Sequence, residues 1–278
     1  MKNSKKIMTA LLAVSVLAAC GQKEEEQKAE PVEQQEAVID VSAEAEQFKS
    51  LLAGEMDSFV TDTELLATAI TTAINEGNLE DAQKLYPLVT MYYERLQPLA
   101  PSFQELDEKI NGDIVEGKET DTTGFQRIAY GLFGEKKTAG YEGIAEELVA
   151  DVKSLQADFA TIDVSETNVL ASAVTMFQDM ANNRLTSPSI AGNEVYAVKA
   201  QTDAAEDLME VFVPRVSTES AEAASNAITK LNEIVAYYEV GKEDYVNYNL
   251  FTTKQEQELI TAVTNVEAAL QQMNESIK

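Results

Sequence analysis

The chain has 278 residues and carries 48 aspartates and glutamates against 21 lysines and arginines, which gives a formal net charge of −27 at pH 7. A field of this sign repels nucleic acid and anionic lipid head groups, so we predict no nucleic-acid partner. The sequence contains no histidine and a single cysteine. It therefore excludes Ser-His-Asp and Cys-His catalysis and every metal site that needs a histidine ligand.

The first twenty residues have the features of an export signal. Three lysines lie within the first six residues, and an apolar run over residues 7–16 follows that is too short to span a bilayer. The segment ends in Leu17-Ala18-Ala19-Cys20, which resembles the lipid-attachment signal of bacterial lipoproteins. We therefore expect a signal peptide over residues 1–19 and a diacylglycerol on Cys20, which would anchor the mature protein to the extracytoplasmic side of a cell membrane. The alternative is an ordinary secretory signal that happens to end in cysteine.

The segment that follows the signal differs in composition from the rest of the chain. Residues 21–41 are rich in Glu, Gln and Lys and contain few large apolar side chains. Such a segment cannot bury enough apolar surface to offset the entropy of ordering it. We therefore expect residues 20–41 to form a lipidated, disordered, acidic tether.

From residue 42 onward the apolar residues recur at steps of three and four, which is typical of amphipathic helices. One stripe runs through Leu170, Val174, Phe177 and Met180/Ala181, and another through Leu259, Val263, Val266, Leu270 and Met273. Thr252 and Gln255 have the spacing of a capping box at the start of the last helix. No stretch alternates long enough to suggest a sheet. The expected helices cover residues 42–76, 78–100, 102–115, 124–133, 138–162, 165–185, 193–216, 217–240 and 253–277.

Helices of about twenty residues joined by short loops pack as antiparallel neighbours. The pattern therefore predicts an all-α, up-and-down helical bundle over residues 42–278. One large bundle and two fused four-helix bundles both suit this length, and we favour the two fused bundles.

Two segments depart from the plain bundle pattern. Residues 92–100 read YYERLQPLA and are followed by ELD at 105–107, and residues 123–134 read TGFQRIAYGLFG. In the second segment, aromatic residues and glycines bracket a short helix, which is more typical of a pocket wall than of a solvated face.

These segments resemble the imelysin-like domain of EfeO/EfeM-type bacterial iron-uptake lipoproteins, also called the M75 peptidase-like family. Residues 93–100 resemble the first motif of that family, Leu106-Asp107 follows at the family's spacing, and residues 124–134 resemble the second motif. The resemblance extends over residues 42–277. It implies a lipoprotein that binds or relays iron to a membrane permease and works with a haem-dependent peroxidase. Glu94 and Asp107 are then the candidate metal ligands, and oxygen ligands of this kind suit iron and other hard cations.

The second motif departs from the family at its two ligand positions. The family has Gly-Phe-His-x-x-Glu, whereas this chain has Gln126 and Ala129 in place of the histidine and the glutamate. An amide oxygen is a weak ligand for Fe(III), and a methyl group provides none. The later family segment that is rich in histidine, aspartate and tryptophan corresponds loosely to residues 193–203, which contain neither histidine nor tryptophan. The expected metal site is thus either remodelled to oxygen ligands or lost.

Each candidate residue has a structural alternative. Glu94 is either a ligand or the ion-pair partner of Arg95 or Arg127, and Asp107 is either a ligand or a turn cap. Gln126 is a packing or hydrogen-bonding residue, or it lines a functional pocket. Two functions therefore stay open: a metal-binding component of an iron-uptake system, and a metal-free interaction or scaffold lipoprotein that keeps the fold. We expect no enzymatic activity, because the chain lacks the ligands that a metallopeptidase needs.

Overall fold

Helices provide nearly all of the regular structure in residues 39–114 and 121–278, which are the residues that the computed structural model describes. The expected all-α fold is confirmed. The signal peptide, Cys20 and residues 20–38 of the expected tether lie outside the described residues. No described helix is long and apolar enough to cross a membrane.

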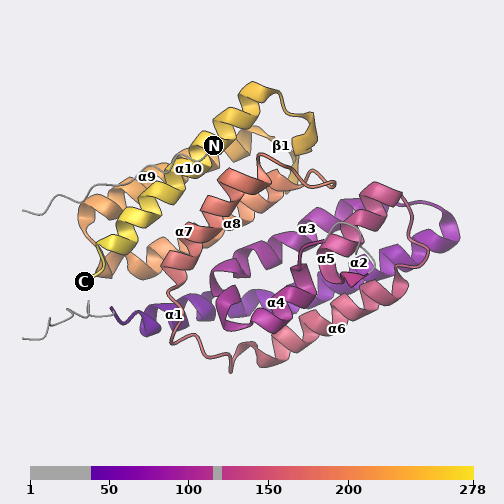
Figure 1. The fold of residues 1–278 in the computed structure, drawn as a ribbon, viewed down its shortest axis with the longest axis horizontal. Coiled ribbons are helices and arrows are strands. Elements are labelled where there is room, and N and C mark those ends of the chain that lie inside the picture. Colours follow the sequence, from indigo (N-terminus) through magenta and orange to yellow (C-terminus); the bar gives the residue numbers. More distant parts are fainter. Residues whose placement is uncertain (1–38, 115–120) are drawn as a thin grey trace, which may run out of the picture. The chain divides into compact units, whose positions relative to one another are not determined.

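The N-terminal group of helices is built around α2. Helix α2 (Met56–Glu76) packs against α3 (Glu80–Leu96) on one side and α6 (Glu142–Phe159) on the other (Figure 1). The short helices α4 (Gln104–Asn111) and α5 (Gly124–Ala129) both pack on α6. They take the place that a fourth long helix would have in a regular four-helix bundle.

The C-terminal group is a more regular four-helix bundle. It consists of α7 (Val169–Asp179), α8 (Glu194–Phe212), α9 (Thr218–Tyr237) and α10 (Thr253–Glu275). Helix α10 packs on both α7 and α9, and α8 packs on the same two helices (Figure 1). Buried apolar positions along α10 match the stripe predicted from the sequence, and the expected capping box at Thr252 is present.

The two groups meet along α3 and α8, which form one of the larger helix contacts in the described residues. The N-terminal helix α1 (Ser42–Leu52) also packs against α8, and one continuous core of buried apolar side chains extends through both groups. This arrangement brings one end of the first motif segment, on α3, next to residues of the C-terminal group.

Several expected helix boundaries are corrected by the structure. The expected helix over residues 42–76 is interrupted by a 3₁₀ turn at Ala53–Glu55, which contains a glycine, a residue with low helix propensity. The expected helix over residues 217–240 ends at Tyr237 and is followed by a small antiparallel hairpin, β1 (Glu239–Gly241) and β2 (Asp244–Tyr245). Glu243 adopts a positive φ of 56° in its turn, which a continuous helix would not permit.

Candidate functional site

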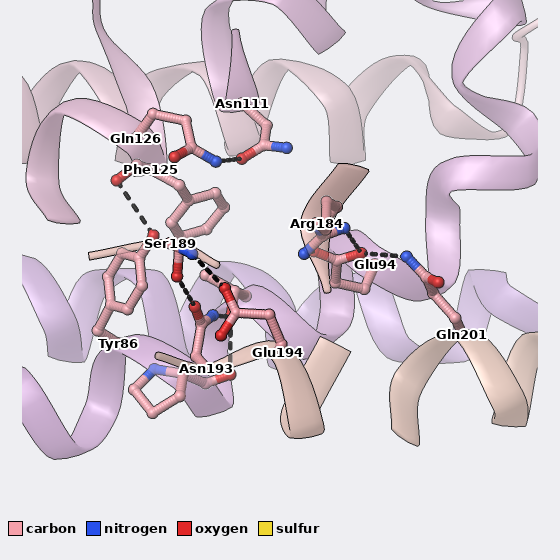
Figure 2. A network of polar contacts seen from close by, with 12 residues as sticks. Tyr86, Glu94, Asn111, Phe125, Gln126, Arg184, Ser189, Asn193, Glu194 and Gln201 are labelled. Carbon is pink, nitrogen blue, oxygen red and sulfur yellow. Dashed lines mark hydrogen bonds and ion pairs between the residues drawn. The ribbon is translucent and has the colours of Figure 1, made fainter. Parts of the chain in front are cut away.

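Glu94 lies near the end of α3 and points into the protein, with only 4% of its surface exposed. Its two oxygens accept hydrogen bonds from the two terminal nitrogens of Arg184, at 2.7 and 2.9 Å (Figure 2). This is the bidentate geometry in which a guanidinium binds a carboxylate most strongly. Glu94 is therefore held in a charged pair that joins the two groups of helices.

Arg184 comes from the C-terminal group, at the end of a π-helical turn (Met180–Arg184) that continues α7. Burial alone would lower the pKa of the Arg184 guanidinium, but the charge and hydrogen bonds of Glu94 outweigh it and hold the pKa above its usual range. The guanidinium therefore stays fully charged in the folded protein.

Gln201 on α8 completes the surroundings of Glu94. Its side-chain nitrogen donates to Glu94 Oε2 at 2.8 Å, and Gln201 itself is fully buried. Three hydrogen bonds thus reach the two carboxylate oxygens. The prediction that Glu94 pairs with Arg95 or Arg127 is wrong, because its partner is Arg184. Arg95 binds Glu55 and Asp207 instead, and Arg127 donates to the hydroxyl of Tyr141 at 2.6 Å.

A cavity of about 490 Å³ lies beside this pair. Its charged lining comprises four carboxyl groups and one guanidinium: Glu94, Asp113, Asp179, Glu194 and Arg184. Glu94 and Glu194 are buried, whereas the residues Asp113 and Asp179 are exposed. The cavity is therefore acidic overall, and Arg184 is the only positive group among the described residues that line it.

Glu194, the first residue of α8, belongs to a second polar network in the cavity (Figure 2). It is 2% exposed, and its Oε1 accepts a hydrogen bond from the backbone N–H of Ser189 at 2.5 Å, while its Oε2 has no hydrogen-bond partner among the described residues. Burial raises the pKa of Glu194 above its usual range, although the bonds from Ser189 act in the opposite direction. The neighbouring Asn193 accepts from the Ser189 hydroxyl and donates to Thr90 on α3 at 3.1 Å.

The two degenerate motif positions lie on α5. Gln126 donates to Asn111 Oδ1 at 3.1 Å, which is the hydrogen-bonding role expected for it, and it also lines the cavity (Figure 2). Ala129 is buried and lies outside the cavity lining. Between them these positions bring one amide and no charged group to the site.

Asp107 lies apart from Glu94. It lines a neighbouring cavity of about 410 Å³ between α4 and α7, and the two cavities share Gln97, Asn111 and Asp179 in their linings. Burial, helped by the charges of Glu108 and Asp113, raises the pKa of Asp107 to about 6. The two candidate ligands therefore face adjoining cavities and do not converge in one.

The residues around Glu94 do not fit a bare metal ion. A metal site needs anionic or imidazole ligands whose lone pairs are free and converge on one point. Within the described residues, no group of three or more His, Cys, Asp or Glu side chains is placed to hold a metal ion. Both oxygens of Glu94 already bind cationic or amide N–H donors.

The sequence interpretation missed Arg184, Asp179 and Gln201. A signal for Arg184 was present, because it continues the apolar stripe of Leu170, Val174, Phe177 and Met180/Ala181 by one further step of three or four residues. A charged residue at a stripe position indicates a buried charge that needs a partner. Gln201 carried no such signal, since amides are common at many helix positions.

The fold and the site together define a class: two fused groups of antiparallel helices that enclose an acid-lined cavity beside two motif segments. A family model for imelysin, the M75 peptidase family, matches residues 54–273. The chain therefore belongs to the imelysin family.

Similar curated proteins extend over most of the chain. A protein of Staphylococcus haemolyticus named an Efem/EfeO family lipoprotein is 28% identical in an alignment that covers 97% of this chain and 98% of that protein. Proteins of Escherichia coli K12 and Shigella flexneri, both named iron uptake system component EfeO, are 25% identical over 249 residues. That match covers 86% of this chain and 65% of each of the two longer proteins.

Proposed function

We propose that this protein is an extracytoplasmic lipoprotein component of an iron-uptake system, and that it serves a membrane permease through protein contacts, without a metal ion held at Glu94. The names of the similar proteins support the role in iron uptake. The signal-like segment that ends in Cys20 supports the lipid anchor and the extracytoplasmic location.

The observation that carries the metal-free form of this proposal is that both carboxylate oxygens of Glu94 already have hydrogen-bond partners. Its oxygens receive three hydrogen bonds, two of them from a guanidinium. A metal ion would have to displace a bidentate, tethered cation to reach this carboxylate.

A second candidate function is the binding or relay of iron itself. The acidic lining of the cavity favours this candidate, because four carboxyl groups outnumber the single guanidinium. Asp107 in the adjoining cavity adds a fifth carboxyl group, which could hold a cation that enters or leaves. In this form the protein would pass iron, as its cargo, to the permease.

We propose no peptidase activity for this chain, despite the name of its family. Metallopeptidases hold zinc through histidine and carboxylate ligands, and the sequence contains no histidine. The similar proteins of Escherichia coli and Shigella flexneri are named for iron uptake, and that of Staphylococcus haemolyticus is named a lipoprotein. None of these names is that of an enzyme.

Whole-cell iron uptake tests the proposed role. We expect a strain that lacks the gene to accumulate less radiolabelled iron under iron limitation, and the wild-type gene to restore uptake. The Glu94→Gln variant should also restore it if no metal is held at Glu94, whereas a relay through Glu94 predicts loss of uptake. Equal uptake with and without the gene would refute the role in iron uptake.

The anchor is tested separately. Metabolic labelling with palmitate should mark the wild-type protein in the membrane fraction. The Cys20→Ser variant should carry no label, and a labelled Cys20→Ser protein would contradict the assignment of Cys20 as the lipidation site.

A further inference from the structure

We propose that the guanidinium of Arg184 is a built-in cation that replaces a metal ion in the cavity, and that its removal opens a cation-binding site around Glu94 and Glu194. This inference rests on the proposed function only where it connects the cavity with iron uptake. The geometry itself stands on the contacts of Arg184 described above.

The position of Arg184 is that of a counterion. It lies at the only buried carboxylate of α3 and contacts both of its oxygens, at 2.7 and 2.9 Å. Glu194 and Asp179 line the same cavity as Arg184, and their charges also raise the pKa of its guanidinium. One positive group thus compensates several negative ones, as a bound metal ion would.

Arg184 has a large advantage over a dissolved ion. It is covalently part of the fold, so it binds Glu94 at a high effective concentration and loses no translational entropy. The surrounding structure also helps to hold the turn that carries it, because Asn183 next to it donates to Asp179 at 2.7 Å. A divalent cation at ordinary concentrations would therefore fail to displace the guanidinium.

The cavity keeps the ligands that a cation would need after Arg184 is removed. Glu94 would be left as a buried carboxylate with only the amide of Gln201. Oε2 of Glu194 already lacks a hydrogen-bond partner within the described part of the chain, and Glu194 is only 2% exposed. Glu94 and Glu194 line the same cavity, and a hard divalent cation such as Mn²⁺ can be bound by one or two carboxylates together with neutral oxygens and water molecules.

Calorimetric titration of the full chain in detergent with Mn²⁺, in physiological salt, tests this inference. Salt screens the diffuse negative charge, so that only a specific site saturates. We expect wild type to show no saturable site, and Arg184→Met to bind one Mn²⁺ at least tenfold more tightly than any wild-type uptake. Glu94→Gln in the Arg184→Met background should abolish that site.

Arg127→Met is the matched control. It removes the same charge from a residue whose side chain donates to a tyrosine hydroxyl and forms no ion pair with any carboxylate of the described residues, so it should gain no site. A saturable Mn²⁺ site in wild type that is lost in Glu94→Gln would overturn the proposal, even if Arg184→Met fails to fold. A folded Arg184→Met protein without a new site would overturn it as well.

These outcomes are separate from those of the proposed function. A wild-type metal site would refute the role of Arg184 but would leave iron uptake in its relay form. Conversely, a strain with unchanged iron uptake would refute the proposed function, while a gain of Mn²⁺ binding in Arg184→Met would still establish Arg184 as a replacement cation.

Discussion

Glu94 and Arg184 are separated by 90 positions in the sequence, yet the two guanidinium nitrogens of Arg184 meet the two oxygens of Glu94 at 2.7 and 2.9 Å. Glu94 lies on α3 in the N-terminal group, and Arg184 follows α7 in the C-terminal group. The pair therefore ties the two groups together at the cavity. It also determines the charge that this cavity presents to a ligand.

Replacement of Arg184 by methionine should destabilise the protein by about 3 kcal/mol, because it leaves the buried Glu94 without its counter-charge. Glu94→Leu in the same chain should recover most of this loss, since both charges are then absent. Urea unfolding followed by circular dichroism measures these differences. Equal stability of wild type and Arg184→Met would show that the pair contributes little to folding.

Addition of Mn²⁺ to the Arg184→Met variant should raise its unfolding midpoint, because an ion that binds only the folded state stabilises it. The wild-type midpoint should stay unchanged under the same conditions. A shift of equal size in wild type would indicate general screening of the acidic surface.

Asp107 should make the stability of the protein depend on pH. Its pKa is raised from 3.8 to about 6 in the folded state, so the folded form binds the proton more tightly than the unfolded form. The resulting stabilisation is fully present below pH 3.8 and is lost as the pH rises through 6. Asp107→Asn should therefore be more stable than wild type at pH 7.5, by about 1 kcal/mol after allowance for solvent screening of a half-exposed group.

The same two proteins should have nearly equal stability near pH 4, where Asp107 is protonated in the folded state. Urea unfolding at both pH values measures this difference. Glu105→Gln is the matched control, because it removes the same charge from an exposed position on α4. If Glu105→Gln stabilises the protein as much as Asp107→Asn at pH 7.5, the effect is one of net charge and does not arise from the burial of Asp107.

Gly124→Ala should be strongly destabilising, by about 2 kcal/mol or more. Gly124 starts α5 with a φ of 70°, and a Cβ built there would lie 2.2 Å from the carbonyl oxygen of Ile110. The clash would push α5 away from α4 and disturb the hydrogen bond between Gln126 and Asn111. Thermal unfolding measures the loss.

Gly143→Ala is the corresponding control within α6. A Cβ at Gly143 meets no atom within 4 Å, and its φ is not positive, so alanine should be neutral or stabilising by up to about 1 kcal/mol. Similar destabilisation by both substitutions would argue against a special role for the conformation of Gly124.

Thr252→Ala should lower the stability by about 1 kcal/mol, because Thr252 and Gln255 form a reciprocal capping box at the start of α10. Thr261→Ala, at an exposed position in the middle of the same helix, should have little effect. Urea unfolding of the two variants compares them directly. If both variants lose the same stability, the loss does not arise from the capping box.

The helical pattern was predictable because it depends on local periodicity. The α10 stripe and the Thr252 cap follow from residues three and four positions apart, and the structure confirms both. The hairpin at Glu239–Tyr245 was not predictable in this way, since it is two short strands whose turn depends on the positive φ of Glu243. The break at Ala53–Glu55 was also missed, although Gly54 marked it.

For the site, the sequence located the two segments that face the cavity and named Glu94 and Gln126 among the residues that line it. It placed Asp107 together with Glu94, whereas the structure places it in the adjoining cavity. It also assigned Glu94 to the wrong arginines. Arg95 is the sequence neighbour of Glu94 but binds Glu55 and Asp207, on other helices.

The sequence by itself determined the class of fold, the acidic charge and the absence of histidine, because each of these depends on composition or on neighbouring residues. The prediction of a lipoprotein signal that ends in Cys20 rests on the same kind of local pattern. Only the tertiary structure decided which cation neutralises Glu94. The contact of α3 with the C-terminal helices brings Arg184 and Gln201 to a carboxylate 90 and 107 positions away. A partner at that separation is selected by the packing of helices, which leaves no mark in the local pattern of residues.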